Sequence, residues 1–424
     1  MSDSIETANL DGQPSARPRL AAIDALRGLA IILMALDHSR DFLGDIRIRP
    51  EDIDTTTVPL FFTRWVTHFC APTFIFLAGV SAWLHGQKLE SKIELTHFLI
   101  TRGIWLVLLE FTVVRFGLLF ALNLGPGMFL VIAAIGSSMV LLGFSSLLPR
   151  KFVLATGVAI VLGHNLLDSV QADQLGALGA CYTLLLRPGY ISSIHTFVGY
   201  PILPWFGVMA IGYGLSPMLT SSDLKRRRFA MGLGLVLITL FLTVRSINSY
   251  GDPKQWAWQT TSAVSEVETE NQPAPTKTGK SIDLRRTTFS FLATSKYPPS
   301  LLFVLMTLGP ALILLALLYW LGEDSWIVSV LRVFGSVPLF FYVLHFYLLH
   351  LAAWALYWIF RGVLISPMHI DVLPEMPAEY GFNGPGWLVQ VYVGWVILLV
   401  ILFPLCKWFR GRKRNSKNWI YSYL

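Results

Sequence analysis

The sequence predicts an all-α integral membrane protein, a single bundle of about ten transmembrane helices. Of its 424 residues, 54% are hydrophobic and only 14% are charged, whereas soluble domains carry about 25% charged residues. The apolar residues are grouped in blocks of about twenty, the length that an α-helix needs to cross a hydrocarbon core of ~30 Å. These observations exclude the two or three soluble domains that length alone would suggest.

Ten apolar segments are long enough to span a bilayer, and an even number of spans puts both chain ends on one side. Lys and Arg are more frequent on that side, which predicts that both termini are cytoplasmic. The same bias explains the net charge of +7 without a nucleic-acid partner, because nucleic-acid binders gather basic residues on one face. The expected spans are 21–42, 60–84, 103–122, 128–148, 152–168, 198–218, 229–248, 299–321, 336–359 and 387–406.

The spans leave little chain for a separate domain. We expect a flexible cytoplasmic segment over 1–18, one membrane domain over 19–410 and a basic cytoplasmic tail over 411–424. Residues 249–298 form a long extracytoplasmic loop within the membrane domain. Its middle, 265–277, is polar and acidic and cannot bury enough apolar surface to order itself.

The first expected span has the densest set of ionisable residues, which are rare inside membranes and mark candidate sites there. Asp24, Arg27 and His38 lie close to one stripe of a helix that turns ~100° per residue. Asp41 follows His38 by one helical turn, so its carboxylate is expected to orient the imidazole. Asp37 is expected to point elsewhere.

The second expected span begins with Arg64 and His68, which are neighbours four residues apart on a helix. Pro72 cannot donate a hydrogen bond to the carbonyl of His68, which predicts a kink at this point. A short connection predicts that the first two spans pack antiparallel, with His68 near the depth of His38. Both imidazoles would then face one cavity near the extracytoplasmic surface.

The later spans contain fewer polar groups. Glu110, Arg115 and Arg245 need partners on neighbouring helices, and structural pairing is their favoured role. His345 and His350 lie about 140° apart on one helix, so only one of them can easily face a given cavity. Packing at an interface explains both histidines equally well.

A metal site is disfavoured by the pattern of possible ligands. The sequence has no HExxH motif, and two helix-borne histidines with carboxylates form a hydrogen-bonded network more often than a zinc site. Its three cysteines, Cys70, Cys181 and Cys406, are too few and too scattered for a disulfide framework or a thiolate cluster. No metal cofactor is expected.

At these residues the chain resembles a known family. Residues 19–30, 34–41, 72–79, 296–300 and 333–342 are similar to the heparan-α-glucosaminide N-acetyltransferase catalytic-domain family and its bacterial relatives. The resemblance implies a multi-span enzyme, in the inner membrane of a bacterium. Such an enzyme would take an acyl group, acetyl in that family, from cytoplasmic acyl-CoA and deliver it to an extracytoplasmic sugar or amino sugar.

One departure from the family affects the catalytic residue. The lysosomal branch has its proposed catalytic histidine in the loop after the first matching helix, whereas residues 42–59 contain none here. The role would pass to His38 or His68, with Asp41 orienting His38. The expected supporting residues are Asp24, Arg27, Asp37, Arg40, Arg64 and His345.

The residue types permit acyl transfer. Histidine serves as base or nucleophile near neutral pH, and Arg64 or Arg40 would stabilise the developing oxyanion. Coenzyme A is a polyanion, so its cytoplasmic entrance should be basic, and residues 225–228 with Arg332 are candidates for it.

Two other classes of protein fit parts of the pattern. A transporter or flippase would use the His-Asp-Arg stripe as a proton relay or counter-ion site, although no pair of broken helices typical of inverted repeats is evident. A membrane scaffold would leave the stripe unexplained. The sequence leaves open the acyl chain, the acceptor, the oligomeric state and the choice between direct and ping-pong transfer.

Overall fold

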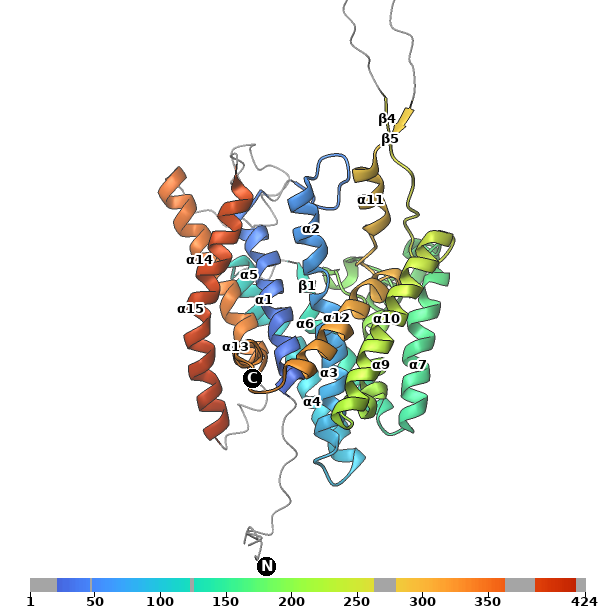
Figure 1. Ribbon diagram of the computed structural model, residues 1–424, viewed down its shortest axis with the longest axis vertical. Helices are drawn as coiled ribbons and strands as arrows, with labels where there is room; N and C mark the ends of the chain where they lie inside the picture. Colours follow the sequence, from blue (N-terminus) through green and yellow to red (C-terminus); the bar gives the residue numbers. More distant parts are fainter. Residues whose placement is uncertain (1–20, 46–47, 123–125, 263–279, 363–385, 417–424) are drawn as a thin grey trace, which may run out of the picture.

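The computed structural model describes residues 21–45, 48–122, 126–262, 280–362 and 386–416. In this part of the chain, eight helical segments are long and apolar enough to cross a membrane. The polytopic all-α fold is therefore confirmed, and Figure 1 shows the helices as one upright bundle. The eight segments are Val58–Gly86, Lys92–Leu119, Arg150–Leu167, Ile202–Leu219, Asp223–Ile247, Leu301–Leu321, Pro338–Ile359 and Trp387–Asn415.

The bundle is built from α-helices, with short 3₁₀ and π-helical segments between some of them. The α-helices are α1 (Ala21–Leu43), α2 (Val58–Thr67), α3 (Cys70–Gly86), α4 (Lys92–Leu109), α5 (Arg115–Leu119), α6 (Val131–Ser145), α7 (Arg150–Gly163), α8 (Gly179–Leu185), α9 (Ile202–Leu219), α10 (Asp223–Ile247), α11 (Leu284–Leu292), α12 (Leu301–Leu321), α13 (Trp326–Gly335), α14 (Pro338–Arg361) and α15 (Trp387–Asn415). A π-helical turn, η1 (Glu110–Val114), joins α4 to α5. The 3₁₀ segments are η2 (His164–Leu167), η3 (Ala172–Leu178) and η4 (Ser192–Ile194).

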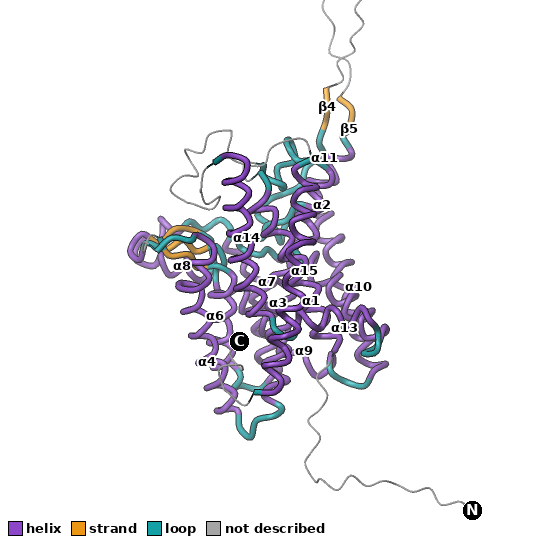
Figure 2. Tube along the Cα trace, turned by 90° about the vertical axis from the view of Figure 1, so that its left-hand side faces the viewer, coloured by secondary structure: helices purple, strands orange, loops and turns teal. Residues whose placement is uncertain are grey.

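Strands are few and short. Strand β3 (Thr196–Val198) pairs in parallel with β1 (Gly127–Phe129) and antiparallel with β2 (Gly189–Ile191), in the register Gly127 to Thr196 and Gly189 to Val198. Strands β4 (Thr260–Ser262) and β5 (Lys280–Ile282) form a separate antiparallel pair. Figure 2 shows this second pair projecting beyond one end of the bundle.

The two remaining predicted spans, 21–42 and 128–148, are also helical. They correspond to α1, which carries five Asp and Arg residues, and to α6, which is 15 residues long. The predicted tail 411–424 is partly helical, because α15 continues to Asn415. The predicted flexible segments 1–18 and 265–277 lie outside the described residues.

The bundle has two ends. The basic face is the end where α1 begins at Ala21 and α3 ends at Gly86, and the distribution of Lys and Arg predicts that it faces the cytoplasm. The far face is the end where α1 finishes at Leu43 and α12 begins at Leu301.

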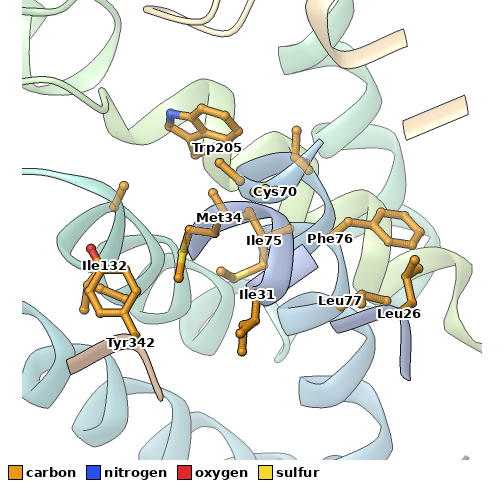
Figure 3. Packing of buried hydrophobic residues seen from close by; sticks show 14 of the residues in the cluster. Leu26, Ile31, Met34, Cys70, Ile75, Phe76, Leu77, Ile132, Trp205 and Tyr342 are labelled. Atoms are coloured by element: carbon orange, nitrogen blue, oxygen red, sulfur yellow. The ribbon is translucent and has the colours of Figure 1, made fainter. Parts of the chain in front are cut away.

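Helix α1 lies inside the bundle, where it contacts α2, α3, α12, α13, α14 and α15. Its apolar residues Ile31 and Met34 pack between Ile132 and Tyr342 on one side and Phe76 on the other (Figure 3). The charged residues of α1 are therefore surrounded by protein instead of lipid, as membrane helices with ionisable groups require.

Glycines allow the closest helix crossings. A Cβ on Gly28 of α1 would lie 1.9 Å from the carbonyl oxygen of Leu331 in α13. Helices α3 and α9 meet in the same way, since a Cβ on Gly212 would lie 2.1 Å from the carbonyl oxygen of Phe76. Small residues at such contacts let helix backbones approach each other in membranes.

The second span is broken where Pro72 predicted a kink. Helix α2 ends at Thr67 and α3 begins at Cys70, so His68 and Phe69 form the junction. Pro72 lacks the N–H that would have bonded to His68. The local backbone therefore follows directly from the sequence.

Buried Arg245 anchors the described ends of the long loop 249–298. Its guanidinium donates to the carbonyl oxygens of Lys254, Ser290, Phe291 and Ala293 at 2.7–2.9 Å. Three of these carbonyls are at the C-terminal end of α11, where cations are favoured. Arg245 therefore has a structural role, as its position in a predicted span suggested: it holds the loop against the end of α10.

Asp252 fixes the segment that leads into α12. Its carboxylate accepts hydrogen bonds from the backbone N–H of Ser295 at 2.8 Å and from the hydroxyl of Ser300 at 2.6 Å. These contacts are on both sides of Lys296. The backbone that carries this lysine is thereby held in place.

We predict that Gly212→Ala destabilises the protein by roughly 1–3 kcal/mol, because the new methyl group forces α3 and α9 apart. Gly232→Ala on α10 is the matched control, since nothing lies within 4 Å of its Cβ and alanine favours helix. Thermal unfolding of the purified variants in detergent gives the comparison. Equal midpoints for the two variants would contradict the packing described.

Candidate functional site

A cavity of about 420 Å³ runs inside the bundle between the two faces. Near the basic face it is lined by His85, Arg102 and Lys413, and near the far face by His38 and Lys296. The volume is within the range of small-molecule sites. Apolar side chains line the middle of the cavity: Ile31, Met34, Phe74, Ala78, Leu99, Leu106, Ile132, Ile135 and Met139.

Arg27 lines the cavity in the half nearer the basic face and is held by three partners. Its guanidinium donates to Asp24 Oδ1 at 2.8 Å, to Ser81 Oγ at 2.7 Å and to the carbonyl oxygen of Gly335 at 3.1 Å. Asp24 and Arg27, which were expected to lie close together on one side of the helix, are therefore in contact. These contacts tie α1 to α3 and α13.

His38 lines the cavity at the other end of α1 and is paired with a second histidine. Its Nδ1 lies 2.7 Å from Nε2 of His345 on α14, and Phe346 stacks on its ring with centroids 4.5 Å apart. His345 is fully buried and lies behind His38, outside the cavity lining. Among the described residues, no group of three His, Cys, Asp or Glu side chains could hold a metal ion.

The hydrogen bonds fix the tautomers of this pair. His345 Nδ1 lies 3.1 Å from the carbonyl oxygen of Phe341, and a carbonyl only accepts, so Nδ1 carries the proton. The Nε2 of neutral His345 is then an acceptor, and His38 Nδ1 must donate to it. The Nε2 of His38 is therefore left with its lone pair, and no hydrogen bond within the described part of the chain occupies it.

The expected contact between His38 and Asp41 does not form. Asp41 instead accepts from Arg40 at 2.6 Å, so His345, on a helix distant in sequence, is the group that orients His38. A guanidinium is a stronger partner for a carboxylate than a neutral imidazole is. The one-turn spacing was compatible with contact but did not decide which partner Asp41 takes.

Asp37 also differs from expectation, because it lines the cavity beside His38. Its two carboxylate oxygens pair with Arg64 at 2.5 Å and with Arg40 at 3.2 Å. Both arginines are consequently engaged in ion pairs. The expectation that Arg40 or Arg64 is free to stabilise an oxyanion is not supported by this geometry.

His68 is buried near this network but does not line the cavity. Its Nε2 lies 3.0 Å from Glu51 Oε1, and its ring packs edge-on against Phe303. The prediction that His38 and His68 face one cavity is therefore wrong. His68 lies at the break after α2 and contacts the loop that contains Glu51.

One further expectation is corrected by the cavity lining. Residues 225–228 and Arg332 are not among its lining residues; Arg226 instead pairs with Asp223 and lies over the Tyr319 ring. His350 is also elsewhere, with Nδ1 3.2 Å from the carbonyl oxygen of Leu118. Local charge density in the sequence did not reveal which basic residues border the cavity.

Glu51 was missed because it lies in a loop with no motif. Burial would raise the pKa of its carboxyl, but the hydrogen bonds and charges of His68 and Arg64 outweigh this and hold that pKa well below the usual 4.5. The Glu51 side chain is 45% exposed, so water weakens these interactions.

We predict that Glu51 makes the protein sensitive to acid. Because the pKa is lower in the folded state, the stabilisation is fully present above the unfolded value near 4.5 and is lost as pH falls through the folded value. The difference in thermal midpoint between the parent and Glu51→Gln should be constant from pH 7 to 6 and shrink below pH 4.5. A difference that grows on acidification would refute this account.

The chain was compared with protein families and with curated proteins. Residues 19–250, more than half of the chain, match the family described as heparan-alpha-glucosaminide N-acetyltransferase, catalytic. No curated protein matches the chain. The matched region contains α1, α3, α4 and α6, which supply most of the cavity lining. The chain belongs to the heparan-α-glucosaminide N-acetyltransferase catalytic family.

Proposed function

We propose that this protein is a membrane acyltransferase that moves an acyl group from acyl-CoA at the basic face to a carbohydrate acceptor at the far face. The observation that carries the proposal is the single cavity that joins two basic residues at one face to a hydrogen-bonded histidine pair near the other. Family membership supports the reaction type. The proposal includes four parts: the acyl-CoA donor, its acetyl group, the sugar acceptor and the cytoplasmic orientation of the basic face.

Electrostatics and dimensions favour this donor. Arg102 and Lys413 line the end of the cavity nearer the basic face and would attract the phosphates of coenzyme A. Arg27 and His38 are eleven residues apart on α1, which is about 16 Å along a helix. A slender thioester arm in the cavity would bring its acyl group from the entrance to His38.

His38 acts through its Nε2 lone pair. As a base, it removes the proton of the acceptor hydroxyl or amine while the acceptor attacks the thioester carbonyl, and it returns that proton to the leaving thiolate. As a nucleophile, it carries the acyl group itself and passes it to the acceptor. In both cases His345 holds the reactive tautomer and stabilises the positive charge that forms on His38.

A transporter or flippase is the second candidate, because a cavity that extends between both faces would also serve substrate passage. The ion pairs of Asp37 with Arg40 and Arg64 favour the enzyme, since they hold fixed the charges that a relay would have to move. Reconstituted vesicles separate the two functions. To test transfer, labelled acetyl-CoA is added on the side of the membrane that the basic face contacts, and glucosamine is supplied on the opposite side. To test transport, labelled glucosamine is supplied alone and its passage across the membrane is measured.

We predict that His38→Ala lowers the transfer rate by about 10²–10⁴ without unfolding the protein, because it removes the base or nucleophile. His345→Ala should cost less, because His38 Nε2 remains but its tautomer is no longer fixed, and it should change the pH profile of the rate. His97→Ala, an exposed histidine of α4 outside the cavity, is the control and should match the parent.

The outcome of the histidine variants decides between mechanisms. An active His38→Ala together with an inactive His68→Ala would move the assignment to His68. Full activity in both would refute the histidine mechanism, and labelled glucosamine crossing the vesicle without acetylation would establish the transporter.

A further inference from the structure

A lysine at the far end of the cavity forms no ion pair within the part of the chain that the structure describes. Lys296 lines the cavity with Asp37 and His38, and the residue is only 8% exposed. Among the described residues, no carboxylate lies within ion-pair distance of its ammonium. A buried charge without a partner is costly, so this arrangement points to negative charge supplied from within the cavity.

The neighbours of Lys296 hold its side chain without neutralising it. The ammonium lies 5.2 Å from the centroid of the Tyr297 ring and 5.9 Å from that of Tyr200, close enough for cation–π attraction. The two phenol oxygens are 3.3 Å apart. Burial would raise the pKa of Tyr297, but the charges of Lys296 and Arg64 and its hydrogen bonds lower it overall.

The backbone around Lys296 is also fixed. The Asp252 carboxylate binds Ser295 and Ser300 on either side of it, and Lys296 is within electrostatic reach of Asp37 and His38. Charges that are oriented before the reaction stabilise a transition state most effectively, because they need no reorganisation. Lys296 meets this condition, whereas Arg40 and Arg64 are already engaged with Asp37.

We propose that Lys296 is the electrostatic catalyst of the transfer, with its ammonium binding the oxyanion that develops on the acyl carbonyl oxygen. This inference rests on the proposed function. When the acceptor attacks the thioester, the carbonyl π electrons move to oxygen, and Lys296 stabilises that charge while His38 holds the acceptor's proton. Collapse of the adduct restores the carbonyl, breaks the carbon–sulfur bond and releases the thiol after His38 returns the proton.

The test measures kcat and KM for Lys296→Met with labelled acetyl-CoA and glucosamine in reconstituted vesicles. We expect kcat to fall by about 10²–10³, the cost of losing one oxyanion-binding group, while both KM values stay within about threefold. Lys296→Arg should recover part of the rate because it keeps the charge. Lys254→Met is the matched control, a lysine of the same loop that is exposed and does not line the cavity.

Stability provides a readout that separates catalysis from structure. Removal of an uncompensated buried charge should leave the thermal midpoint of Lys296→Met unchanged or higher, whereas a structural lysine would lower it. If that variant does not fold, Lys296→Gln, which keeps a hydrogen-bond donor and loses the charge, gives the same measurement.

Several results would overturn the proposal. A parental kcat in folded Lys296→Met would remove Lys296 from the reaction. A KM for glucosamine raised tenfold at unchanged kcat would show that Lys296 binds the acceptor instead. No transfer by the parent protein would refute the proposed function itself, which is a different outcome from an active parent with an insensitive lysine.

Discussion

The structure depends on the burial of a charged helix inside a membrane bundle. Helix α1 carries five Asp and Arg residues, and such groups are costly in a hydrocarbon core unless protein surrounds and pairs them. Its neighbours meet both needs, because Gly28 permits the close approach of α13 and Arg27 and Asp37 have polar partners on other elements. The position of α1 then determines where the cavity lies.

Pairing these charges also determines which groups remain available for chemistry. At the far end, Arg40 and Arg64 are occupied by carboxylates, so their charges serve the fold. Within the described residues, one nitrogen of His38 bonds to His345 and the other has no hydrogen bond, and Lys296 forms no ion pair. The proposed reaction uses these two groups, His38 and Lys296, which are not held in ion pairs with other described residues.

The cavity combines charged ends with an apolar middle, which suits a reaction whose reactants arrive from opposite faces. In the proposed reaction, the basic groups at one end of the cavity would attract a polyanionic donor, and the apolar middle would keep bulk water away from its thioester. Burial of Lys296 would also strengthen its interaction with a developing negative charge. Positioning and electrostatics would therefore account for much of the proposed catalysis.

The sequence alone determined the features that depend on local chemistry. The length of apolar segments predicted the helical spans, Pro72 predicted the break after α2, and the ionisable residues of α1 indicated the site. His38 was identified in this way because it lies close to one stripe of the first span with Asp24 and Arg27, and ionisable groups are rare inside membranes.

Only the tertiary structure decided which partner each of these groups takes. Asp41 was the obvious neighbour of His38 at one turn, yet His345, 307 residues away in sequence, is its partner. His68 pairs with Glu51 and does not line the cavity, whereas Lys296, from a loop, lines it together with His38. Helical spacing limits which residues can meet on one helix, but the pairing of buried charges across helices depends on how the whole bundle packs.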